Sequence, residues 1–191
     1  MTRCGVGEAQ WLPPGAWAEY EVEDGEEVVL GIDIGGSRAA SAIVAVTRDL
    51  RIAAVHVYEG DDAVLTVSEK VLELARHFNV VEAAYDPWRW RSEALRAEQQ
   101  GLRVVEFPQS HARMTVASEG LHSAVVEKRL RHPGHRDLDR HVAAAVARAT
   151  GRGWRLDKSA HDAQIDAVVA LAMAVERAEH REPAARLLGW I

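Results

Sequence analysis

Between residues 28 and 59 the chain carries three apolar, partly β-branched runs separated by very short polar segments, and this spacing leaves few folds open. The runs are VVLGIDI, ASAIVAVT and RIAAVHVYE, and the segments GGSR and RDL separate them. Connections this short join antiparallel neighbours, because a parallel pair needs a crossover of a dozen or more residues. The sequence therefore predicts a three-stranded antiparallel meander.

The rest of the chain continues with helix-period and strand-period segments in alternation. Proline or glycine ends several of them, as Pro87 ends a strand and Gly101 a helix. The predicted helices are 63–78, 88–100, 114–132, 136–150 and 162–178; the predicted strands are 79–86 and 102–107, with a short strand or turn at 153–159. The order β-β-β-α-β-α-β-α-α-α predicts an α/β fold. Its mixed sheet has three antiparallel strands, then parallel strands, flanked by helices, which is the order of the ribonuclease H-like fold.

Three aspartates stand where such a sheet would bring them together. Asp33 lies within the first strand, Asp86 ends the fourth, and Asp166 is near the start of an apolar helix. Three carboxylates in one place repel one another unless cations neutralise them. Oxygen-rich sites of this kind suit Mg²⁺ or Mn²⁺, and two such ions ~4 Å apart support phosphodiester hydrolysis.

Each aspartate also has a purely structural interpretation. Asp33 could cap the turn that its glycines form, and Asp86 could initiate a turn or cap the helix after it. Asp162 and Asp166 are spaced i, i+4, so they would share a helix face at the favourable end of the helix dipole.

The histidines and tryptophans give weaker signals. Six histidines (111, 122, 132, 135, 141 and 161) suggest zinc, but no second ligand pair completes a site, and we expect solvated or substrate-facing side chains. Cys4 is the single cysteine, so the chain has neither an intramolecular disulfide nor a thiolate zinc site. The stretch Trp88–Arg91 alternates aromatic and cation. It could contact nucleic acid through Arg89 and Arg91, or pack tryptophan against arginine.

Composition and absent motifs exclude several classes. The 191 residues fit one domain, and the net charge of -6 gives no broad basic footprint. The chain has no P-loop, no nucleophile elbow, no signal peptide and no membrane-length apolar run, so we expect a cytoplasmic protein with no membrane contact. We expect a lead-in segment at 1–27, a domain at 28–182 and a tail at 183–191.

Over nearly its whole length the sequence resembles the C-terminal nuclease domain of tailed-bacteriophage large terminase subunits. WLPPGAW resembles the stretch that joins the family's ATPase and nuclease domains, and VVLGIDIGGSRAASAIVAV its first hairpin. VVEAAYDPWRW is similar to the strand with the second aspartate. IDAVVALAMA, at its distance from RLDKS, is similar to the closing motif.

The resemblance implies a metal-dependent DNA endonuclease that cuts concatemeric viral DNA during packaging. Asp33, Asp86 and Asp166 would then be the catalytic ligands of two Mg²⁺ or Mn²⁺ ions, with Asp162 as an additional or substitute ligand. Lys158 and Arg155 would meet the phosphates of double-stranded DNA. The family's ATPase domain is missing from the sequence, and the expected partners are the small terminase subunit and the portal protein in the host bacterial cytoplasm.

Three other interpretations stay open on the sequence alone. The chain could be an inactive DNA-binding or docking remnant, or a Holliday-junction-resolvase-like nuclease, which shares the carboxylate logic. GIDIGGS also resembles the phosphate-binding hairpin of actin-like-fold sugar kinases and ATPases, but no second glycine-rich hairpin accompanies it.

Overall fold

The computed structural model describes residues 23–36, 39–60, 63–132, 134–151 and 153–180. The expected meander is present, with β1 and β2 antiparallel and β2 and β3 antiparallel. Its strands are β1 (Glu27–Asp33), β2 (Ser41–Thr47) and β3 (Ile52–Tyr58). Most of the expected lead-in, residues 1–22, and the expected tail lie outside the described residues, so those domain boundaries stay predictions.

Two parallel strands extend the sheet on the side of β1 away from β2. Strand β4 pairs parallel to β1, and β5 pairs parallel to β4, which gives the strand order β3-β2-β1-β4-β5. The intervening elements are α1 (Ala63–His77), β4 (Asn79–Tyr85), α2 (Pro87–Gln99) and β5 (Val104–Glu106). The mixed, ribonuclease H-like sheet predicted from the element order is therefore confirmed.

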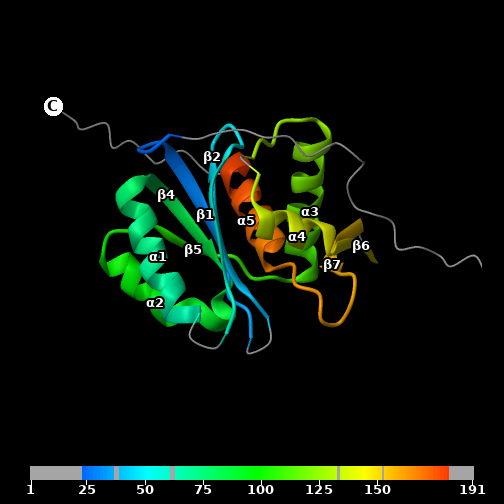
Figure 1. Cartoon of the computed structure of the whole chain (residues 1–191), viewed down its shortest axis with the longest axis horizontal. Coiled ribbons are helices and arrows are strands. Elements are labelled where there is room, and N and C mark those ends of the chain that lie inside the picture. Colours follow the sequence, from blue (N-terminus) through cyan, green and yellow to red (C-terminus); the bar gives the residue numbers. More distant parts are fainter. Residues whose placement is uncertain (1–22, 37–38, 61–62, 133, 152, 181–191) are drawn as a thin grey trace, which may run out of the picture.

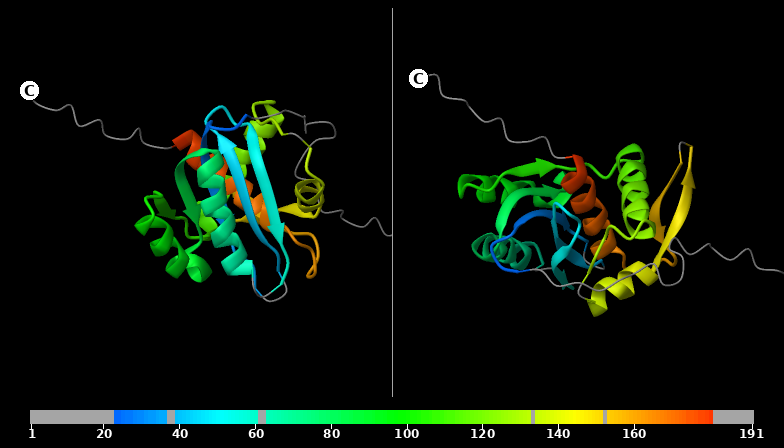
Figure 2. Two further views of the ribbon diagram at one scale, coloured as in Figure 1. Left: turned by 60° about the vertical axis from the view of Figure 1, so that its left-hand side comes forward. Right: turned by 90° about the horizontal axis from the view of Figure 1, so that it is seen from above.

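The central strand β1 serves two cores because its residues alternate between the faces of the sheet. Val28, Leu30 and Ile32 pack in the cluster with the apolar sides of α1 and α2. Val29 faces the other way, into the cluster built on α3 (His111–Val126) and α5 (Asp166–His180). Figure 2 shows α5 lying between the sheet and α3. Both faces are covered, which explains why β1 and β2 read as nearly continuous apolar runs.

Helix α5 approaches β1 unusually closely at Gly31. A Cβ added to Gly31 would lie 2.0 Å from the carbonyl oxygen of Ala170 and 3.0 Å from the amide nitrogen of Ala174. Only glycine permits this backbone contact. Farther along α5, Arg177 Nε donates to Oε1 of the fully buried Glu82 of β4 at 2.5 Å. These contacts fix the height and the tilt of α5 over the sheet.

The second half of the chain departs from expectation most at one element. Residues 136–150 were expected to form one helix, but α4 (Arg136–Ala143) ends early. Strand β6 (Ala145–Thr150) follows and forms an antiparallel hairpin with β7 (Gly153–Lys158). The prediction was wrong because pairing with β7 overrode the helix preference of this alanine-rich run. The short strand expected at 153–159 is confirmed as β7 (Figure 1).

Candidate active site

Asp33 ends β1 on the side of the sheet that α5 covers, since it lies two residues after Gly31 and so shares its face. Its carboxylate is partly buried, and Oδ1 accepts a hydrogen bond from Gln109 Nε2 at 2.7 Å. Gln109 lies in the loop between β5 and α3. The side chain that the sequence placed in a buried strand thus lies at the edge where the parallel strands end.

The charge on Asp33 is disfavoured by its surroundings. Burial, followed by the negative charge of Asp166 and, more weakly, that of Asp86, raises the pKa of Asp33 from 3.8 to about 7, against the opposing effects of Gln109 and Lys158. The three aspartates therefore interact electrostatically from three separate elements. A cation at this edge would reverse the penalty.

Asp166, the first residue of α5, is the most buried of the three carboxylates at 6% exposure. Burial is the largest cause of the raised pKa of Asp166, while backbone amides and Lys158 act in the opposite direction. Its Oδ2 atom is buried and accepts no hydrogen bond. A buried carboxylate oxygen without a donor is costly, and a bound cation would satisfy it.

Asp86 performs the structural role that the sequence left open. It precedes α2, and its Oδ1 accepts a hydrogen bond from the Trp88 amide at 3.0 Å, which is an N-cap with Pro87 in the first turn. The cap uses one carboxylate oxygen. The other oxygen is left without a role in the cap, and the negative charge of Asp86 still raises the pKa of Asp33.

These three carboxylates suit a divalent cation by their chemistry. Mg²⁺ and Mn²⁺ prefer oxygen ligands. A bound cation would give the buried Oδ2 of Asp166 a partner and would stabilise the ionised form of Asp33, which its surroundings disfavour. As the side chains stand, no group of three or more His, Cys, Asp or Glu within the described part of the chain is arranged to hold an ion.

Asp162 does not share a helix face with Asp166. The sequence placed both in one helix, but α5 begins only at Asp166, and Asp162 lies exposed in the turn before it. The expectation of an i, i+4 pair was wrong because the polar segment before Ile165 forms a turn and is not part of the helix. Asp162 is not among the groups that raise the pKa of Asp33.

The basic residues proposed to contact DNA divide into two groups. Lys158, at the end of β7, lies near enough to Asp33 and Asp166 to oppose the rise in both of their pKa values. Arg155 points to Asp157, with its Nη2 3.5 Å from Oδ2. Arg91 forms an ion pair with Glu106 at 2.7 Å.

The two tryptophans of the alternating stretch on α2 lie in different surroundings. Trp88 is 84% exposed, whereas Trp90 is buried and its Nε1 donates to Ser68 Oγ at 3.1 Å. The Arg89 guanidinium lies against the glycine turn after Asp33, 3.0 Å from where a Cβ on Gly36 would be. One tryptophan is therefore core and the other is surface beside Asp86.

Two contacts of the site had no clear sequence signal. Gln109 holds Asp33, and the buried His141 accepts a hydrogen bond from the Ala167 amide. We expected solvated or substrate-facing histidines, but His132 and His141 are 3% and 0% exposed. The position of Gln109 directly after a strand-ending proline, at the carboxyl edge of the sheet, was the one available hint.

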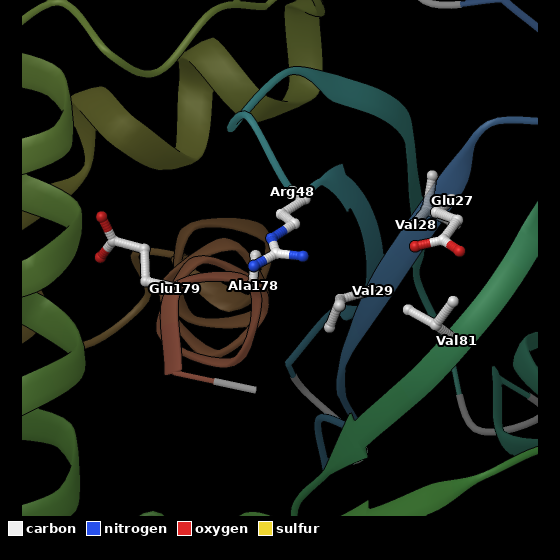
Figure 3. A pocket seen from close by; sticks show the side chains of 7 residues that line it. All are labelled: Glu27, Val28, Val29, Arg48, Val81, Ala178 and Glu179. Carbon is white, nitrogen blue, oxygen red and sulfur yellow. The ribbon is translucent and has the colours of Figure 1, made fainter. Parts of the chain in front are cut away.

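A small cavity lies at the opposite end of β1 from the aspartates. Figure 3 shows its lining residues, among them Glu27, Arg48 and Glu179, around a volume of about 40 Å³. That volume holds a few water molecules at most. We therefore place the chemistry at the aspartate edge and not in this cavity. Among the described residues, no helix is both long and apolar enough to cross a membrane.

Comparison with known proteins gives one family. Residues 54–182 match the family described as terminase large subunit, endonuclease domain. The matched span contains Asp86 and Asp166 and begins after Asp33. The large terminase subunit of Enterobacteria phage HK97 is 32% identical over 108 residues, which cover 55% of this chain and 21% of that protein. The chain thus spans about a fifth of the length of this curated relative.

Solved structures share the fold. The HK97 large terminase matches with a TM-score of 0.73 and 20% identity over 87% of this chain and 43% of that one. The large terminase nuclease of thermophilic phage G20c matches with a TM-score of 0.70 and 17% identity over 87% and 94%. The SPP1 phage g2p nuclease domain with bound Mn matches with a TM-score of 0.54 and 18% identity over 80% and 86%.

Proposed function

The chain belongs to the endonuclease-domain family of terminase large subunits, and we propose on that premise that it is a metal-dependent endodeoxyribonuclease acting by phosphodiester hydrolysis. The observation that carries the proposal is the convergence of three carboxylate charges, from β1, the end of β4 and the start of α5, at one edge of the sheet.

We propose Asp33, Asp86 and Asp166 as the ligands. Bound divalent ions supply an activated water and neutralise charge on the phosphate that is cleaved. Asp166 offers its unpartnered buried Oδ2, and Asp86 offers the oxygen that its helix cap leaves over. Gln109 restrains Asp33 through one oxygen, and we propose that Lys158, whose charge acts on both Asp33 and Asp166, donates to a phosphate oxygen.

The identity and number of the ions are part of the proposal. Nuclease domains of the G20c phage terminase are described with bound magnesium, cobalt or zinc, and that of SPP1 with Mn. By analogy we propose two Mg²⁺ or Mn²⁺ ions here. Three carboxylates provide enough negative charge to hold two divalent cations close together.

We further propose that the domain spans residues 28–182 and cuts concatemeric viral DNA during genome packaging. The partners would be the small terminase subunit and the portal protein, within the host bacterial cytoplasm. Arg155, Arg89 and Arg91 remain proposed DNA contacts, which would require Arg155 and Arg91 to leave their acidic neighbours Asp157 and Glu106.

One observation favours a second candidate, an inactive docking module. In the described part of the chain, no three ligands are arranged to hold an ion, and in an inactive module they would stay apart when metal is added. In an active nuclease, by contrast, added ions draw the carboxylates together.

Nicking of supercoiled plasmid with Mn²⁺ tests the proposal. The wild-type chain should convert plasmid to open-circle and linear forms, Asp33→Asn should not, and EDTA should stop the reaction. Asp24→Asn, an exposed aspartate before the far end of β1, is the matched control and should cut normally. Cleavage that persists in Asp33→Asn would refute the ligand assignment, and a wild-type chain without any cleavage would favour the docking module.

A further inference from the structure

Helix α5 begins without a capping side chain of its own. The residue before Asp166 is Ile165, whose apolar side chain accepts no hydrogen bond, and the first backbone bond of the helix runs from the Val169 amide to the Ile165 carbonyl at 3.0 Å. The amide of Ala167 therefore has no acceptor within the helix. Because Ala167 is buried, that amide needs a partner from elsewhere.

The partner comes from another element. His141 of α4 accepts a hydrogen bond at Nδ1 from the Ala167 amide at 2.9 Å. The imidazole is fully buried, and α4 lies beside α5 (Figure 1). An acceptor at Nδ1 requires the neutral tautomer with its proton on Nε2. Burial, the largest cause, lowers the pKa of His141, which agrees with a neutral ring.

We propose that His141 is a positioning residue that caps α5 from α4 and thereby fixes the orientation of the Asp166 carboxylate. The inference rests on the proposed function, because it gives Asp166 a ligand's role. Asp166 and Ala167 are adjacent in the first turn of α5, so a restraint on one amide restrains the carboxylate beside it.

Two other contacts that restrain α5 lie farther along the helix and do not replace this one. The close approach of Gly31 reaches Ala170, one turn later, and the ion pair with Glu82 reaches Arg177, about three turns later. Core packing also restrains the first turn, because Ala167 and Val168 are fully buried, but neither packing nor these two contacts gives the Ala167 amide an acceptor. Backbone amides, that of Ala40 among them, act on the Asp166 carboxylate, but its buried Oδ2 accepts no hydrogen bond.

The test compares three variants by calorimetric Mn²⁺ affinity, by melting temperature and by hydrogen exchange of the Ala167 amide. His141→Leu fills the space without an acceptor, whereas His141→Asn keeps an acceptor oxygen near the place of Nδ1. Leu138→Ala is the control, since Leu138 is the other buried residue of α4. It should lower the melting temperature and leave the Mn²⁺ affinity of the folded protein unchanged.

We expect His141→Leu to weaken Mn²⁺ binding by about tenfold and to expose the Ala167 amide to exchange, and His141→Asn to restore both. Equal loss of affinity in His141→Leu and Leu138→Ala would overturn the proposal, because packing alone would then explain it. So would an Nδ1–H tautomer of His141 in ¹⁵N–¹H correlation spectra of the unaltered protein.

The two proposals fail in different ways. A wild-type chain that binds no Mn²⁺ would refute the proposed function and, with it, the ligand role of Asp166. The exchange rate of the Ala167 amide and the tautomer of His141 need no metal, and they decide separately whether His141 holds the helix.

Discussion

Asp33 occupies a position where its own charge opposes folding. It is partly buried, it faces the negative charges of Asp166 and Asp86, and its pKa is raised to about 7. Groups of this kind persist at functional sites, where an unfavourable charge in the empty protein becomes favourable with the ligand. This combination separates Asp33 from an ordinary turn residue.

The stability of the metal-free protein should therefore depend on pH through Asp33. A folded-state pKa of about 7 above the ordinary 3.8 means that the ionised form destabilises the fold, so stability falls as pH rises from about 4 to 7. In EDTA, Asp33→Asn should be more stable than wild type at pH 8, by ~2 kcal/mol after allowance for partial exposure, and nearly equal to it at pH 4. Urea unfolding at both pH values measures the difference.

Manganese should reverse the ranking. With Mn²⁺ at pH 8 the wild-type protein should gain melting temperature by mass action, and Asp33→Asn should gain much less. A variant that is less stable than wild type in EDTA at pH 8 would contradict the account of Asp33.

The two aspartates around the start of α5 should differ sharply. Asp166→Ala removes a buried carboxylate beside Lys158 and should abolish plasmid cleavage. Asp162→Ala changes an exposed turn residue and should leave the cleavage rate within about twofold of wild type, since exposed substitutions away from a site have small effects. Initial rates of nicking decide, and the opposite ranking would move the proposed ligand to Asp162.

Among single residues, the sequence pointed to the buried carboxylates more clearly than to the side chains that contact the site. Asp33 and Asp166 stood out because a carboxylate within an apolar segment is unusual. Gln109 and His141 did not, because their contacts with Asp33 and Ala167 join elements that are far apart in the chain. Such contacts depend on tertiary packing, and no local pattern encodes them.

Among the elements, α5 carries the closest packing, and Gly31 makes it possible. Gly31→Ala would place a methyl group 2.0 Å from the Ala170 carbonyl oxygen and should destabilise the fold by about 3 kcal/mol or more. Gly120→Ala is the matched control: its Cβ meets only a Glu179 oxygen at 3.8 Å, and within α3 it should be neutral or stabilise by up to about 1 kcal/mol. Chemical denaturation of both variants tests the contact, and equal effects would contradict it.

Elements with strong periodicity were predicted well, and ambiguous ones were not. The meander and α1 follow from apolar runs of clear period. The run around residues 145–150 has alanines that favour a helix, and the pairing with β7 over α3 that makes it a strand is a tertiary effect. The helix expected at 114–132 ends at Val126 because Lys128 adopts a left-handed conformation, φ 58°. A lysine gives no sequence warning of such an end.

For the whole molecule, a net charge of -6 sets the conditions for DNA binding. The aspartate edge repels phosphates unless cations neutralise it, so we expect weak DNA affinity in EDTA and at least tenfold tighter binding with Ca²⁺. Fluorescence anisotropy with a labelled duplex measures both. Lys158→Ala should weaken the Ca²⁺-dependent binding, and unchanged affinity on adding EDTA would argue against a shared site for metal and DNA.

The order of elements sufficed to predict the topology because short connections and right-handed crossovers leave few alternatives. It also predicted that Asp33 and Asp86 would lie at the same edge of the sheet, since β1 and β4 are parallel neighbours. The spacing of the carboxylates did not follow, because it depends on tertiary packing and on local contacts such as the helix cap in which Asp86 accepts from the Trp88 amide.

The direction of β1 and α5 has a practical consequence for single-molecule work. β1 has 7 residues and runs toward Asp33, so Glu27 lies about 20 Å from that carboxylate. α5 has 15 residues and runs away from Asp166, which puts His180 a similar distance from it, about 21 Å. Both ends of the described domain therefore lie at the pole opposite the aspartates (Figure 1). A surface tether or a fluorescent fusion at either end would leave the aspartate edge open to a long DNA molecule.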